Sequence, residues 1–329
     1  MAEIFVHVGP PKTGSTYLQD QLWRHREDLA RREVLLPIEH PNEMWLAAVD
    51  VQDGAFVHVD VPEARGAWAR VVHRVLDHGG RVVVSHELLG LSDDDHVARI
   101  AASFDRAELH VVVMARDLAA MLPSLWQETV KMADPDQPWP QFLAEQQARR
   151  SPWTDAAGIV RRWLAHVPPS RVHVVTVPPR GTPPAVLLGR FAAALGIDTG
   201  EWDAGSPANE SLDVVQVELL RRLTRAAVGR LDRRDLQRLV NDRLVHLVPR
   251  SGAGRGVRVP PEARSWIEGE TRRRRAALAD AGVRVHGTLE DLEPTGDDWA
   301  AQTHVVTDAE LLEASVGLLV GLLENRPSN

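Results

Sequence analysis

Four runs of β-branched and aliphatic residues, separated by helix-like segments, constrain the fold of this chain most strongly. The runs are almost continuously apolar rather than alternating, which is typical of parallel strands buried on both faces. They occupy residues 4–8, 81–85, 109–115 and 171–177. Helical patterns lie between them, at residues 15–31, 62–78 and 93–104 and in a stretch ending near 131. This alternation predicts an α/β fold with a parallel central sheet between two helical layers, a three-layer α/β/α domain.

The remainder of the chain is predicted to be mostly helical. Short extra strands are expected at residues 34–36 and 283–286, and the Pro- and Trp-rich segment 134–152 is expected to form an irregular flap. Beyond residue 200, helical periodicity covers residues 212–244, 261–281 and 308–323. We therefore expect a single domain over 1–329, with an α/β core at 1–200 and a mainly helical C-terminal extension at 201–329.

Composition narrows the classes of function. The net charge of -8 argues against a nucleic-acid-binding protein, which would usually carry a basic face. The absence of cysteine excludes disulfides, zinc–thiolate sites and cysteine nucleophiles. Residues 316–323, the longest late apolar stretch, are too few to span a bilayer, and no signal-like segment precedes the first strand. A cytoplasmic protein without membrane contact is expected, and its oligomeric state is not readable.

The first strand runs into a loop with the chemistry of a phosphate-binding turn. Its residues are Pro11-Lys12-Thr13-Gly14-Ser15-Thr16. Backbone N–H groups at the start of the following helix would hold an anion, with Gly14 allowing close approach. Lys12 is one of only two lysines in the chain, the other being Lys131, so a random lysine at this place is improbable.

The loop departs from the phosphate loop of nucleotide triphosphatases. Gly9 and Gly14 have the glycine spacing of that motif, but Ser15 stands where the lysine should be. The strand at 81–85 ends in Ser85, and the strand at 109–115 runs into Arg116 before Asp117, so neither ends in a magnesium-binding carboxylate. The loop is therefore suited to an anion without the usual metal-bridged triphosphate.

Residues 11–16 resemble the P-K-T-G-[TS]-T loop of sulfotransferases that use 3′-phosphoadenosine 5′-phosphosulfate (PAPS). The resemblance implies a cytosolic, bacterial-like member with the P-loop sulfotransferase fold, whose nucleotide-binding core lies in residues 1–200. It implies that Pro11, Lys12, Thr13, Gly14, Ser15 and Thr16 bind the 5′-phosphosulfate. The product would be adenosine 3′,5′-bisphosphate (PAP), and no metal is required.

A second nucleotide element is similar to that family's 3′-phosphate motif. Arg116 follows the third long strand and Ser124 lies eight residues later, with Pro123 expected in the first turn of a helix. The family often adds a late basic, glycine-containing segment. Here the loop at 250–258, with Arg255, is either such a contact or a surface loop.

The candidate bases follow the second long strand. Ser85-His86 is similar to the Thr-His of soluble sulfotransferases, which implies that His86 is the catalytic base. Glu87 is the alternative, since related carbohydrate sulfotransferases use a glutamate. The unperturbed pKa of histidine, about 6.5, suits a base at neutral pH.

The resemblance implies transfer of a sulfuryl group to a hydroxyl or amine of a small-molecule or carbohydrate acceptor. The tryptophans that are candidates to line an acceptor pocket are Trp45, Trp126, Trp139 and Trp153, although scattered tryptophans are as often core. Two alternatives stay open, an atypical P-loop kinase or NTPase and a non-catalytic nucleotide-binding protein.

Overall fold

The computed structural model describes residues 2–55, 57, 60–132, 137–149, 151–200, 202–203, 205, 211–250, 255–301 and 305–324. The chain divides into two compact units. The sheet unit comprises Met1–Leu118, Arg150–Ala208 and Glu268–Glu293. The helical unit comprises Ala119–Arg149, Asn209–Ile267 and Pro294–Asn329. The organisation into one functional domain stays a prediction.

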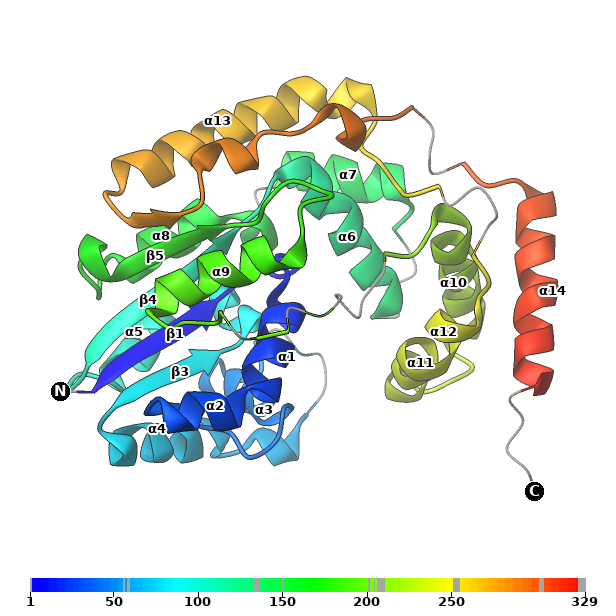
Figure 1. Ribbon diagram of the computed structural model, residues 1–329. Helices are drawn as coiled ribbons and strands as arrows, with labels where there is room; N and C mark the ends of the chain where they lie inside the picture. The colour runs from blue at the N-terminus through cyan, green and yellow to red at the C-terminus, as the bar shows by residue number, and fades with distance from the viewer. Residues whose placement is uncertain are drawn as a thin grey trace. The chain divides into compact units, whose positions relative to one another are not determined.

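The sheet unit is built on one six-stranded sheet whose order is β2-β3-β1-β4-β5-β6 (Figure 1). Every pair of neighbouring strands is parallel. This confirms the parallel sheet, the four long strands and both short ones. The strands are β1 (Glu3–Val8), β2 (Val34–Leu35), β3 (Arg81–Ser85), β4 (Glu108–Ala115), β5 (Val172–Thr176) and β6 (Arg284–His286).

Alternate side chains of each strand point to opposite faces of the sheet. Both faces are covered, each by an apolar cluster. On β1, Ile4, Val6 and Val8 join one apolar cluster and Phe5 joins the other. Three layers result, as predicted. The first cluster includes residues of α3 (Glu43–Val51), α4 (Ala67–His78), α5 (Asp94–Ala102) and α8 (Ala156–Trp163), and the second those of α1 (Ser15–Arg24), α2 (Arg26–Arg31) and α9 (Pro184–Leu195).

Several helices differ from the predicted pattern. The predicted helix at residues 15–31 is divided at His25 into α1 and α2. The helices α3, α8 and α9 were not predicted. In α3 the first-turn glutamate, Glu43, is itself buried together with most of the apolar residues, so the helix lacks a clear polar face.

The described part of the helical unit consists of helices and connecting segments. Its helices are α6 (Leu118–Lys131, whose first residue belongs to the sheet unit), α7 (Trp139–Ala148), α10 (Val214–Ala227), α11 (Arg233–Leu239), the π-helical turn η5 (Val240–Leu244), α12 (Val245–Leu247) and α14 (Asp308–Glu324). The helix α13 (Arg264–Asp280) continues from this unit into the sheet unit. No helix in the described ranges combines the length and the apolar character needed to cross a membrane.

The prediction of an irregular flap at residues 134–152 is wrong for its central part. Residues Trp139–Ala148 form α7, with Pro138 at the N-cap and Pro140 in the first turn. Proline is tolerated there because the first N–H groups of a helix have no intrahelical partner. Residues 133–136 and 150 lie outside the described residues.

Candidate functional site

The loop after β1 presents the N-terminus of α1. Gly14 caps the helix with a left-handed φ of 89°, and Lys12 also has a positive φ, 64°. The buried hydroxyl of Thr13 donates to the carbonyl of Pro10 at 2.8 Å, which fixes the turn. No side chain caps α1, and its first turn contains no acidic residue. This end of α1 therefore suits an external anion, because the helix dipole and its N–H groups favour negative charge.

The segment that follows β3 packs directly on the start of this loop. The N–H of Gly9 donates to the carbonyl of Glu87 at 2.9 Å. A Cβ on Gly9 would lie only 2.4 Å from that oxygen, so the close approach requires glycine. The structure thereby places His86 and Glu87 beside the loop that begins at Gly9, at the carboxyl ends of β1 and β3, where open parallel sheets bind ligands.

Arg116 reaches the same loop from the end of β4. Its guanidinium donates to the carbonyl oxygen of Lys12 at 2.5 Å. The two sequence motifs, 104 residues apart, therefore meet within the sheet unit. A guanidinium carries five donors in a planar fork, a geometry that suits a phosphate.

Two other predicted cofactor residues belong to the helical unit. Ser124 donates to the carbonyl of Ala120 at 3.4 Å, inside α6. Pro123 was expected in the first turn of a helix, but it lies in the interior of α6, which begins at Leu118. Because proline has no backbone N–H, α6 lacks the hydrogen bond that this position would otherwise donate to the preceding turn. Arg255 forms an ion pair with Glu310, and residues 251–254 of its loop lie outside the described residues. Their contact with a nucleotide stays a prediction.

The side chain of His86 is held in a defined orientation. Its Nδ1 accepts from the N–H of Leu88 at 3.2 Å and lies 4.0 Å from Oε2 of Glu87. Burial lowers the pKa of His86 below its ordinary value, although the carboxylate of Glu87 opposes this. The imidazole is therefore neutral at pH 7, as a proton acceptor must be.

Glu87 is a buried carboxylate with its own partners. Its Oε2 accepts from Nε2 of Gln19 on α1 at 2.9 Å. Burial acts to raise the pKa of Glu87, but His86, a backbone hydrogen bond and Gln19 together hold it below its usual value. The group is thus ionised at neutral pH, next to the imidazole.

His7 lies under this pair as a structural histidine. It is fully buried on β1, and its Nδ1 lies 2.8 Å from the hydroxyl of Ser85. Its ring meets Phe191 edge-on at 4.9 Å. Burial lowers the pKa of His7 to about 4, so it is uncharged at neutral pH.

A cavity of about 380 Å³ opens beside His86 in the sheet unit. Its lining is largely apolar, and the described residues that line it include no lysine or arginine. The lining residues are Thr16, Gln19, Asp20, Leu22, Trp23, Leu36, Pro37, Ile38, Pro41, Asn42, Met44, Trp45, Val83, Ser85 and His86. Of the four candidate tryptophans only Trp45 belongs to it, whereas Trp126 and Trp139 are buried with their rings 5.6 Å apart in the helical unit.

Sequence analysis missed most of this lining, although α1 carried a signal for it. Thr16, Gln19, Asp20 and Trp23 recur at positions i, i+3, i+4 and i+7, which places them on one helical face. That face begins in the first turn after the loop. The spacing therefore indicates a surface that continues from the anion site, and Gln19 and Trp23 were identifiable from it.

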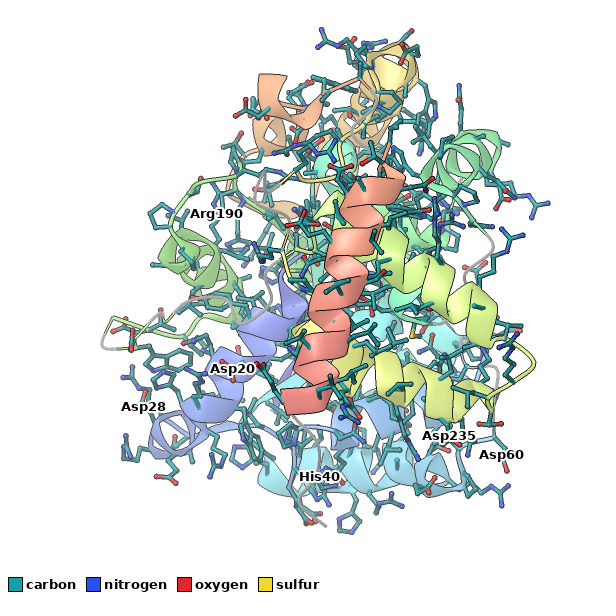
Figure 2. The ribbon with its side chains drawn as sticks, turned by 90° about the vertical axis from the view of Figure 1, so that its right-hand side faces the viewer. Asp20, Asp28, His40, Asp60, Arg190 and Asp235 are labelled. Atoms are coloured by element: carbon teal, nitrogen blue, oxygen red, sulfur yellow. The ribbon has the colours of Figure 1, made fainter. Side chains whose placement is uncertain are left out.

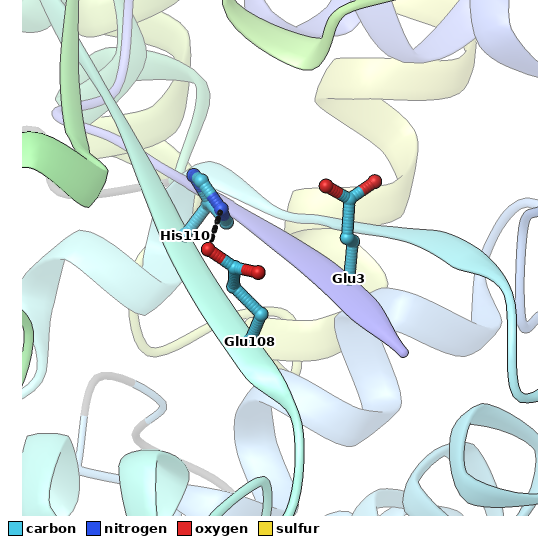
Figure 3. Close-up of side chains that lie close together, drawn as sticks. All are labelled: Glu3, Glu108 and His110. Carbon is cyan, nitrogen blue, oxygen red and sulfur yellow. Dashed lines mark ion pairs between the residues drawn. The ribbon is translucent and has the colours of Figure 1, made fainter. Parts of the chain in front are cut away.

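A group of side chains that could bind a metal lies at the amino ends of β1 and β4, at the opposite end of these strands from the loop. Among the described residues, Glu3, Glu108 and His110 form a group with ligand atoms within 4.8 Å of one another (Figure 3). Both carboxylates are already paired with arginines, Glu3 with Arg81 at 2.6 Å and Glu108 with Arg171 at 3.0 Å. These ion pairs neutralise the acidic charge at the amino ends of β1 and β4, away from the loop.

Comparison with known proteins identifies the family. Among solved structures, the chain is similar to a sulfotransferase from Alicyclobacillus acidocaldarius, at 15% sequence identity over 71% of this chain and 98% of that chain, with a TM-score of 0.44. No protein with a curated description matches. The profile of the sulfotransferase domain family matches residues 3–176, more than half of the 329 residues. The chain therefore belongs to the sulfotransferase family, as the loop at residues 11–16 predicted.

Proposed function

We propose that this protein transfers the sulfuryl group of PAPS to a hydroxyl or amine of an uncharged, largely apolar small molecule. The observation that carries the proposal is the contact between Arg116 and the carbonyl of Lys12. It brings a guanidinium to an anion-binding helix terminus that has no acidic residue in its first turn. A nucleotide with phosphates at both its 5′ and 3′ positions would place one phosphate on the helix terminus and the other on the guanidinium.

The loop and the arginine divide the binding of the two phosphate groups. Residues Pro11 to Thr16 would receive the 5′-phosphosulfate on backbone N–H groups, with Ser15 and Thr16 adding hydroxyl donors. Arg116 would bind the 3′-phosphate with two parallel charge-assisted hydrogen bonds. Ser124 and Arg255 are proposed as additional 3′-phosphate contacts. This donor set offers positive charge and N–H groups and needs no metal bridge.

Bound PAPS supplies an activated sulfur that an acceptor attacks in line with the leaving phosphate. Lys12 would stabilise the negative charge that develops on that phosphate. His86 would take the proton of the acceptor, since it lines the cavity and is neutral. With Nδ1 accepting from Leu88, the neutral ring carries its proton on Nε2. Accepting a proton at Nε2 therefore requires the other tautomer, whose Nδ1–H faces the Glu87 carboxylate 4.0 Å away.

The cavity supports the choice of acceptor. Trp23, Ile38, Met44 and Trp45 offer apolar surface, and among the described lining residues Asp20 is the one charged side chain apart from the titratable His86. A sulfated or carboxylated glycan would bring negative charge to a cavity whose described lining residues include no lysine or arginine. An uncharged phenol, aliphatic alcohol or arylamine fits better because it needs no counter-charge.

A transfer assay tests the proposal. The protein is incubated with PAPS and either a phenol, an aliphatic alcohol, an arylamine or an anionic glycan, in the presence of EDTA. We expect PAP to form together with a sulfated apolar acceptor, and a Trp45→Ala variant to raise KM for that acceptor. Phosphoryl transfer from Mg-ATP without any use of PAPS would support the P-loop kinase alternative instead. Binding of PAP without turnover of any acceptor would support a non-catalytic nucleotide-binding protein.

A further inference from the structure

The helix α14 has two apolar faces, and the described part of the chain covers one of them. Leu311, Ala314 and Leu318 are buried where α14 packs on α10 and α12 within the helical unit. Gly317 and Gly321 lie on this inner side, because a Cβ on either would meet Pro249 at 2.6 Å or Leu247 at 3.5 Å. The inner face is thus satisfied by the chain itself.

The outer face carries a continuous row of exposed aliphatic side chains, the α14 stripe. Its members are between 47% and 67% exposed, and Figure 2 looks onto this helix. They follow one another at helical spacing, so they form one face rather than scattered contacts. The stripe consists of Leu312, Val316, Leu319, Val320 and Leu323. A contiguous aliphatic row of this kind on a solvent-exposed surface is typical of an interaction site.

The charges of α14 argue against a membrane surface as the occupant of the stripe. Every charged residue of the helix is acidic: Asp308, Glu310, Glu313 and Glu324. Helices that lie on membranes usually carry lysine or arginine around the apolar face, and α14 has neither. The five residues that follow in the sequence, 325–329, contain no aliphatic or aromatic side chain other than proline, so they offer nothing to bury the stripe.

The spacing of the stripe matches a second copy of itself. Leu312, Val316, Leu319 and Leu323 are separated by four, three and four residues, a pattern that reads the same in both directions. In an antiparallel pair with its two-fold axis midway between Val316 and Leu319, Leu312 of one copy lies opposite Leu323 of the other. Val316 then lies opposite Leu319. Such an isologous contact is what a symmetric dimer requires, and the 4-3-4 spacing is that of a coiled-coil seam.

The charge distribution selects the antiparallel arrangement. Three of the four acidic residues lie in the first two turns of α14, and residues 314–323 are uncharged. In the antiparallel register Glu313 lies opposite Leu322 and Glu324 lies opposite Leu311 of the other copy, whereas a parallel pair would set each of the four acids beside its own copy. Antiparallel helix dipoles also oppose each other favourably. We propose that the protein forms a two-fold dimer through an antiparallel pair of α14 helices.

The oligomeric state tests this proposal. Light scattering after gel filtration, over a range of micromolar concentrations, should give a dimer for the wild-type chain and a monomer for Leu319→Glu. The matched control is Leu76→Glu, an aliphatic residue of α4 that is 49% exposed and outside the stripe, which should stay dimeric. Circular dichroism should show that both variants are folded. A wild-type monomer at all concentrations, or a folded Leu319→Glu dimer, would overturn the proposal.

Cross-linking tests the direction of the pair, because the chain has no cysteine of its own. The double variant Leu312→Cys/Leu323→Cys should form a disulfide-linked dimer under oxidation, since the two positions face each other across the axis. The single variant Leu323→Cys should not. Efficient linking by Leu323→Cys alone would show a parallel pair and contradict the antiparallel arrangement.

Discussion

Lys12, in the loop after β1, has a backbone conformation that does not favour stability. A positive φ of 64° is unfavourable for any residue with a Cβ, at about 1–2 kcal/mol. The chain tolerates this at a position where its sequence has one of only two lysines. The backbone conformation and the side-chain charge are both consistent with the proposed contact of Lys12 with an anionic ligand.

Replacing Lys12 by alanine should remove charge stabilisation without removing the loop. Turnover of PAPS should fall by about 10²–10³, the usual cost of losing one preorganised donor. The melting temperature should stay close to that of the wild type, because alanine keeps the same backbone requirement. Steady-state kinetics and thermal melts measure the two effects. Lys131→Ala, the other lysine, is the control, and an active Lys12→Ala enzyme would remove Lys12 from the mechanism.

The pH dependence of turnover should distinguish His86 from Glu87. Burial lowers the pKa of His86, so the neutral base should be lost only as the pH falls through a value below 6.5. His86→Asn should lose about 10²–10⁴ in turnover together with this acidic limb, while keeping its affinity for PAP. Glu87→Gln should lose less, and its acidic limb should move to lower pH because the carboxylate no longer raises the pKa of His86.

The opposite pattern would reassign the base. If His86→Asn turns over normally and keeps its acidic limb, while Glu87→Gln is inactive, Glu87 accepts the proton. Gln19→Ala then provides a further check, because it removes the hydrogen bond that helps to lower the pKa of Glu87. Under that assignment the acidic limb should move to higher pH in Gln19→Ala.

Among the secondary-structure elements, those that are buried on both faces were predictable from the sequence. The strands of a sheet covered on both faces are uniformly apolar, and this made β1, β3, β4 and β5 visible in the sequence. The helix α3 has a buried glutamate, Glu43, and mostly buried residues, so it gave no clear amphipathic signal. The prolines before and within α7 indicate a loop unless their position in the first turn is known.

The candidate site was predictable only in part, for a physical reason. The residues of the loop, Arg116 and His86 were identified because each follows a strand. The bond between Gly9 and the carbonyl of Glu87 joins backbone groups 78 residues apart, and no local pattern indicates it. The cavity likewise depends on how α1 packs against the segment after β2. The spacing on α1 indicates one wall of the cavity but not this packing.

Two glycine substitutions test the packing of these elements. Gly9→Ala would place a Cβ 2.4 Å from the carbonyl oxygen of Glu87 and should cost about 1–3 kcal/mol of unfolding free energy. It should also reduce turnover, because it displaces the segment with His86. Gly189→Ala, in α9 with no atom within 4 Å of the added carbon, should instead stabilise the protein by about 0.5–1 kcal/mol. Denaturant titration gives both values, and equal effects would contradict the packing described.

In the molecule as a whole, the motifs that follow three strands meet at the carboxyl end of a parallel sheet. The loop after β1, the pair after β3 and Arg116 after β4 lie at the carboxyl ends of neighbouring strands. Such an edge is where open α/β sheets bind nucleotides. The position of the lysine before the second glycine, and the arginine beside the loop, then favour a bisphosphate over a triphosphate.

The affinity of the protein for adenosine 3′,5′-bisphosphate tests this account most directly. Calorimetry in EDTA should show PAP binding about 10- to 100-fold more tightly than AMP, as one charged hydrogen-bonding site contributes about 1.5–3 kcal/mol. Arg116→Ala should reduce the affinity for PAP to near that for AMP, and leave AMP unaffected. Mg-ATP, measured with magnesium in place of EDTA, should bind more weakly than PAP. Tighter binding of Mg-ATP than of PAP would contradict the proposed use of PAPS.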